Sequence, residues 1–267
     1  MPRHGSIEQE KGPPGLLDFL KPSIQTFQDF FFLGGRTVAN LPRRPHYGDD
    51  IAMQMDIIGV GSLPIVLLTG FFSGAVMALQ MSRALAQYGA SGQVGSIVAI
   101  TLVRELGPVL TALLVAGRNG SGIASELGSM KVTEQIDAMR ALGTDPLQKL
   151  VKPRLIATAV MLPLLTIIAD FVGLIGGYLV AVPLLSLTTS SQYWNNAYRL
   201  LEYNDITQGL LKPFLFAIII ALVGCHYGLR TTGGTQGVGR ATTQAVVVAS
   251  IWIFVTTVLI TRIFVNL

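Results

Sequence analysis

The sequence has little of what a water-soluble protein of this size normally carries. Only 13% of its 267 residues are charged, whereas 51% are hydrophobic. The mean hydropathy is +0.56. A soluble chain of this length needs more charge to cover its surface. The composition therefore argues against an ordinary soluble domain and predicts an integral membrane protein.

Residues that carry chemistry are also scarce. The one cysteine, Cys225, lies in an apolar segment and excludes an intramolecular disulfide framework. No G-x-x-x-x-G-K-[ST] loop occurs, and no His, Cys, Asp or Glu cluster has the spacing of a metal site. The lone His226 on an apolar span is typical of a packing residue. We therefore expect no enzyme, and no cofactor or metal held by this chain itself.

The first fifty residues are expected to precede the membrane-spanning domain. Residues 1–15 contain clustered glycine and proline, and we expect them to be disordered. Residues 16–50 begin with an apolar stripe at helical spacing, which predicts an amphipathic helix in the membrane interface. A packed cytosolic helix is the alternative. A basic corner at 42–45 follows, and the membrane domain should occupy 51–267.

Five apolar segments are long enough to cross a bilayer, which predicts an all-α membrane fold. The first is interrupted by glycine and Pro64, so we expect it to be broken or re-entrant. Its residues Gly70, Gly74 and Ala78 form a ladder of small side chains that lets another helix approach closely. The predicted spans are about 57–78, 94–124, 155–187, 209–229 and 245–265.

Basic residues are distributed unevenly among the loops. They gather in residues 1–50, between the second and third spans, and after the fourth span. The other two loops offer only Arg83 and Arg199. Because cytoplasmic loops carry the excess of lysine and arginine, the N-terminus should be cytoplasmic and the C-terminus should face outward. The net charge of +4 is explained by this asymmetry, without nucleic-acid binding.

A short amphipathic segment follows the second span. Its apolar residues are Val132, Ile136, Met139 and Leu142, spaced as one stripe of a helix. A helix of this length cannot cross the membrane, so it should lie at the cytoplasmic face and couple the membrane domain to a partner. The charged residues off the stripe, which would contact that partner, are Lys131, Glu134, Asp137 and Arg140.

Four ionisable residues fall inside apolar spans. Arg104, Glu105, Asp170 and Lys212 would each cost at least ~2.5 kcal/mol unpaired at the bilayer centre, so each should face a partner or a wet cavity. Glu105 and Lys212 lie at similar depth in the outer half and could pair. The pair would be either a salt bridge that joins two helices or part of a polar collar around a substrate headgroup.

Two long motifs carry a resemblance. The run LVRELGPVLTALLVAGRNGSGIASELGSMKVTEQIDAMRALGTDP at 102–146 resembles the signature of the MlaE (YrbE) family of ABC-transporter permeases. The later run TGGTQGVGRATTQAVV at 232–247 is similar to the second motif of that family. The similarity extends over nearly the whole chain from the predicted interfacial helix onward.

The resemblance implies a function and a set of partners. The chain would be one half of a homodimeric permease in the bacterial inner membrane. Two cytoplasmic ATPase subunits would bind ATP and magnesium below it, and a ring of MCE-domain proteins would stand on the periplasmic side. A small STAS-domain protein binds the ATPase in many such systems. The implied cargo is glycerophospholipid moving between inner and outer membranes, which maintains outer-membrane lipid asymmetry.

The residues themselves agree with this resemblance on several points. Five spans are too few to enclose a path, so we expect two copies to pair through a small-residue face. A lipid needs an apolar cavity with a few polar groups. Two alternatives remain, namely an ion-coupled secondary transporter and a membrane scaffold that transports nothing. The predicted cavity wall consists of Met77, Leu79, Met81, Leu85 and Tyr88.

Overall fold

The computed structural model describes residues 34–35, 37 and 47–265. The predicted disordered segment 1–15 and most of the predicted interfacial helix and basic corner lie outside these residues. In the described part, five helical segments are long and apolar enough to cross a membrane, which confirms the predicted all-α fold. They are Gly48–Ala86, Ser91–Val132, Leu147–Leu184, Tyr203–Leu229 and Gly234–Phe264.

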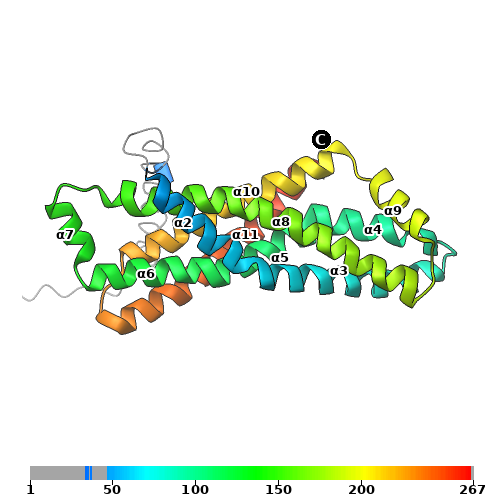
Figure 1. Ribbon diagram of the computed structural model, residues 1–267, viewed down its shortest axis with the longest axis horizontal. Helices are drawn as coiled ribbons and strands as arrows, with labels where there is room; N and C mark the ends of the chain where they lie inside the picture. The colour runs from blue at the N-terminus through cyan, green and yellow to red at the C-terminus, as the bar shows by residue number, and fades with distance from the viewer. Residues whose placement is uncertain (1–33, 36, 38–46, 266–267) are drawn as a thin grey trace, which may run out of the picture.

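The first span is broken, as predicted. Helix α2 (Gly48–Ile58) gives way to a 3₁₀ turn at Val60–Ser62, and α3 (Leu63–Ala86) follows with Pro64 in its first turn. Proline has no N–H to donate to the preceding turn, so the α-helical pattern is interrupted there. Figure 1 shows α2 inclined to α3 while both continue in the same general direction. The span is therefore broken and does not turn back on itself.

The second span consists of three helices joined by π-helical turns. Helices α4 (Val94–Thr101), α5 (Gly107–Val115) and α6 (Ser121–Val132) are separated by wider turns. A π turn contains one extra residue, which shifts the faces that the flanking helices present. The two turns are Leu102–Leu106 and Ala116–Gly120.

The small-residue ladder of α3 packs inside the chain. It lies against α8 (Lys152–Leu179), and a Cβ placed on Gly74 would come within 1.8 Å of the Gly173 carbonyl oxygen. The same construction on Gly70 gives 2.6 Å to the Ala169 carbonyl oxygen. The prediction that this ladder lets another helix approach closely is therefore confirmed, and the helix is α8 of the same chain.

The two ends of the molecule carry different short helices (Figure 1). Helix α7 (Gln135–Ala141) lies at one end, and α9 (Ser190–Arg199) lies at the other. Helix α9 was not predicted. Its buried Tyr193 donates a hydrogen bond to the Leu174 carbonyl at 3.1 Å, and burial raises the pKa of this phenol above its ordinary value. This residue fixes α9 against α8.

The last two spans complete the bundle. Helices α10 (Tyr203–Leu229) and α11 (Gly234–Val265) are joined by a tight turn in which Gly233 and Gly234 have φ of 87° and 66°. These angles are readily adopted only by glycine. The largest buried cluster joins residues of α2, α3, α5, α6, α8, α10 and α11. Along α11, several large apolar side chains remain exposed, among them Val247, Ile251, Phe254 and Val258.

Candidate functional site

Glu105 and Lys212 are in contact. Lys212 Nζ on α10 lies 2.7 Å from Glu105 Oε1 in the first π turn of the second span. The Lys212 side chain is fully buried, whereas the Glu105 side chain is 35% exposed. The argument from similar depth therefore located this pair correctly.

Lys212 makes two further hydrogen bonds. Its Nζ donates to the Arg104 carbonyl oxygen at 2.8 Å and to Thr261 Oγ1 on α11 at 2.9 Å. Thr261 in turn donates to Glu105 Oε1 at 2.8 Å. Pro108, four residues after Arg104, cannot donate the usual helical hydrogen bond to that carbonyl. Lys212 thus satisfies a backbone group that proline leaves free, and it joins α10, α11 and the second span.

Arg104 binds elsewhere. Its guanidinium forms an ion pair with Asp205 near the start of α10, and its side chain is 43% exposed. Asp205 also accepts from the Glu202 backbone N–H at 3.0 Å and so belongs to the α10 capping box. The sequence analysis missed both Asp205 and Thr261. The spacing of Glu202 and Asp205 before an apolar run was the available signal for the first.

Asp170 is not joined to these charges in the part of the chain that the structure describes. It lies buried on α8 beside Gly107, where an added Cβ would come within 1.7 Å of Asp170 Oδ1. That oxygen has no hydrogen-bond partner among the described residues. Asp170 therefore requires glycine at position 107. The structure connects only Arg104, Glu105 and Lys212 of the four predicted intramembrane charges.

An open apolar groove follows α3, and its volume is about 530 Å³. Three polar side chains, Thr69, Ser73 and Gln80, also line it. It lies between α3 and the part of the second span that surrounds Gly107. The apolar lining consists of Leu68, Phe72, Val76, Met77, Leu106 and Leu110.

Met77 is the one predicted wall residue that lines this groove. Leu85 packs against the buried cluster that contains Tyr193 and Ala197 of α9, and Met81 is partly buried. Leu79 and Tyr88 are exposed, the latter by 83%. The groove follows the α3 face that carries Leu68, Phe72 and Val76, which the sequence analysis did not identify because helical periodicity does not say which face meets α5.

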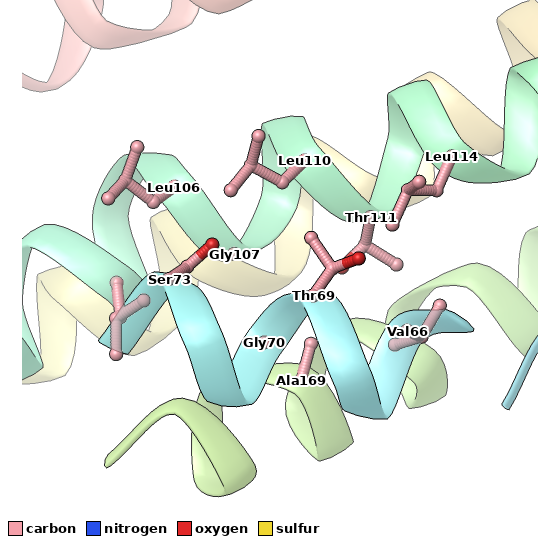
Figure 2. Close-up of a pocket in the computed structure, with 11 residues that line it drawn as sticks. Val66, Thr69, Gly70, Ser73, Leu106, Gly107, Leu110, Thr111, Leu114 and Ala169 are labelled. Carbon is pink, nitrogen blue, oxygen red and sulfur yellow. The ribbon is translucent and has the colours of Figure 1, made fainter. Parts of the chain in front are cut away.

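A narrow crevice continues from the groove between α3 and the second span. It shares Thr69, Ser73, Leu106 and Leu110 with the groove, and its volume is about 10 Å³. Figure 2 shows the hydroxyl oxygens of Thr69 and Ser73 pointing from α3 toward the second span.

The predicted coupling helix is divided in two. Lys131 and Val132 belong to the end of α6, and α7 begins only at Gln135. Between them Glu134 has a left-handed backbone with φ of 60°, which reorients the chain. The predicted apolar stripe is therefore wrong at its end. Ile136 is buried and Met139 partly buried, but Leu142 lies beyond the helix and is 84% exposed.

Charged side chains of this segment contact one another across the break. Lys131 Nζ lies 2.6 Å from Asp137 Oδ2, and Arg140 Nη1 lies 3.0 Å from Asp137 Oδ1. The hydrogen bond from Lys131, aided by Arg140, holds the pKa of Asp137 below its ordinary value, so the carboxylate stays ionised at neutral pH. Glu134 is exposed and has no ion-pair partner among the residues described here.

Comparisons with known proteins agree along most of the chain. The sequence profile of the family described as Permease MlaE matches residues 51–263. A probable ABC transporter permease protein of Rickettsia felis is 43% identical over 91% of this chain and 92% of its own length. One from Synechocystis is 40% identical over 84% and 85% of the two chains. Trigalactosyldiacylglycerol 1, a chloroplastic protein of Arabidopsis thaliana, is 35% identical over 84% of this chain and 63% of its own.

Proposed function

The chain belongs to the MlaE permease family, and from this premise we propose that it moves glycerophospholipids between the inner and outer membranes of a bacterium. Its relatives are named as ABC transporter permeases, so the chain is a multi-pass membrane subunit of such a transporter and works with an ATPase. The lipid cargo and the maintenance of outer-membrane asymmetry are the proposed part. The Arabidopsis relative is named after a glycerolipid, trigalactosyldiacylglycerol, and this name supports a lipid cargo.

The groove along α3 is the observation that carries the proposal. Its volume of about 530 Å³ falls within the range of ligand sites, and six of its nine lining residues are apolar. An acyl chain would be buried there against Leu68, Phe72 and Leu106. The groove is open along one side in the single chain, so a second copy would close it around the lipid. We propose a homodimer on this ground.

The partner ATPase would bind at the α7 end. ATP and magnesium would be bound by that subunit, because this chain contains no P-loop. Glu134 is the exposed acid there, while Asp137 orders the α6–α7 corner through Lys131 and Arg140. We propose that this corner transmits the motion of the ATPase to α6 and hence to the second span.

The remaining partners follow from the orientation. With the α7 end in the cytoplasm, the N-terminus is cytoplasmic and the C-terminus periplasmic. A ring of MCE-domain proteins would then meet the α9 end, and a STAS-domain protein would bind the ATPase. In this arrangement the Glu105–Lys212 pair lies toward the periplasmic side. Because all three Lys212 donors are occupied, we assign that pair to joining helices.

Photo-crosslinking in cells tests the cargo. A photoreactive amino acid at Met77 should capture phospholipid, and the yield should change when the partner ATPase cannot hydrolyse ATP. A matched probe at Val258, on the exposed face of α11, should capture surrounding lipid regardless of ATPase activity. Equal labelling at both positions, unaffected by the ATPase, would contradict the groove as the transport site.

A further inference from the structure

On the α3 side, the crevice beside the groove contains two hydroxyl groups that are not used by the fold, and Thr111 of α5 also lines it. Thr69 and Ser73 are one helical turn apart on α3, and their oxygens point toward the second span (Figure 2). Among the described residues neither hydroxyl has a hydrogen-bond partner. By contrast, Thr158 and Thr166 on α8 donate to the carbonyl four residues earlier, at 2.6 and 2.9 Å.

The crevice is small because glycine permits close approach without filling it. Gly107 lies against the Asp170 side chain of α8, and Gly70 lies against the Ala169 backbone of the same helix. The remaining volume of about 10 Å³ accommodates roughly one water-sized group. The crevice is thus a mostly apolar recess beside the groove that also carries hydroxyl groups, and a ligand in the groove can place a single polar atom in it.

The position of the recess limits which atom can occupy it. Thr69 lies near the middle of the segment Gly48–Ala86, far from either end of the span. Polar groups at such depth need partners from protein, from ligand or from water in a cavity. None of the residues that line the groove or the recess is charged, so the recess offers a phosphate no counter-ion. Two neutral hydroxyl donors fit a neutral acceptor such as an ester carbonyl.

We propose that Thr69 and Ser73 both donate hydrogen bonds to one ester carbonyl of a glycerolipid whose acyl chains lie in the groove. This inference rests on the proposed function and extends it, because it assigns recognition to the glycerol-ester region of the lipid. The headgroup then contributes little at this depth. The two hydroxyls make the permease selective for lipids whose chains are joined by esters.

Diether lipids test this selectivity because they keep the headgroup and chains but lack the carbonyls. The intact permease–ATPase complex is placed in nanodiscs, and a diester phosphatidylglycerol competes with its diether analogue for crosslinking at Met77. Two neutral hydrogen bonds correspond to roughly a tenfold preference for the diester. In Thr69→Val/Ser73→Ala, diester capture should fall to the level of the diether, whose own capture is unchanged.

Control variants separate recognition from folding. Thr166→Val removes a span hydroxyl that bonds within α8, and it should keep the wild-type preference. Thr69→Ser keeps a hydroxyl and should keep the wild-type preference for the diester. The single Ser73→Ala variant should lose part of that preference. These single variants test the proposal even if the double variant does not fold.

The outcomes are distinct. Equal capture of both lipids by the wild type would overturn the proposal and would mean that water alone fills the recess. An unchanged preference in the folded variants lacking these hydroxyls would overturn it as well. Capture of neither lipid by the wild type would overturn the proposed lipid cargo itself, and this inference with it.

Discussion

A single buried lysine satisfies several requirements at once. Lys212 neutralises Glu105, donates to the Arg104 carbonyl that Pro108 leaves free, and donates to Thr261 Oγ1 on the last span. Proline within a span is tolerated when neighbouring groups satisfy the freed backbone. Because the same lysine serves both, the ion pair and the irregular helix stabilise each other.

Removal of one member of this pair should cost more than its own contacts suggest. Lys212→Met leaves the Glu105 carboxylate without its positively charged partner and removes the side-chain donor to the Arg104 carbonyl, so we expect a loss of ~3–5 kcal/mol in unfolding free energy. Adding Glu105→Gln should recover part of that loss. A double-mutant cycle on denaturation of the detergent-solubilised protein measures the coupling. Strict additivity would show that the two side chains do not interact.

Glycine at the α3–α8 contact is equally specific. Gly74→Ala would place a methyl group within 1.8 Å of the Gly173 carbonyl oxygen, so the two helices must separate. We expect destabilisation of at least ~1–3 kcal/mol, measured as a lower melting temperature. The control is Gly122→Ala on α6, where an added Cβ meets nothing within 4 Å. Equal melting temperatures for the two variants would contradict the described packing.

The two ends of the molecule differ in the kind of side chains that form their contacts. At the α7 end, the left-handed Glu134 divides a long helix into two, and the Asp137 ion pairs hold the corner. At the α9 end, the rings of Tyr178, Trp194 and Tyr198 stack with centroid separations of 5.6 and 5.9 Å. Charged side chains therefore form the described contacts at one end, and aromatic side chains form them at the other.

Charge reversal at the α7 corner should separate the permease from its motor. In Glu134→Lys/Asp137→Lys, an exposed acid is lost and the Lys131 and Arg140 contacts become repulsive. We expect loss of co-purified ATPase, with the melting temperature of the membrane domain little changed. Gln87→Lys, at the opposite end, should leave the ATPase bound. Full retention of active ATPase by the double variant would mean that it binds elsewhere.

Local patterns predicted these elements only in part. Long apolar runs identified five spans, and glycine with Pro64 identified the break in the first, because both features act within one segment. Helix α9 was missed because it has no apolar run, although Thr189 caps it by accepting from the Gln192 N–H at 3.3 Å. The division at Glu134 was missed because a left-handed residue other than glycine leaves no signal in helical periodicity. The partner of the small-residue ladder depends on tertiary packing.

At the scale of the whole molecule, the chain is one subunit of an ABC transporter. The groove is open, and α11 exposes Val247, Ile251, Phe254 and Val258, which lipid or another subunit must cover. The irregular second span connects the α7 corner to the groove through α6, the π turn Ala116–Gly120 and α5. A movement at that corner can therefore reach Leu106 and Leu110 along one continuous segment.

Blocking the groove is the most direct test of lipid transport by this path. Cys225, the one native cysteine, is buried, so an introduced thiol can be labelled selectively. In the reconstituted complex, Val76→Cys labelled with a bulky maleimide should lose at least about tenfold in ATP-dependent phospholipid transfer between membranes, as expected for ~1.4 kcal/mol or more. Unlabelled Val76→Cys and labelled Val258→Cys should retain the transfer rate. An undiminished rate in the fully labelled Val76→Cys complex would contradict transport through the groove.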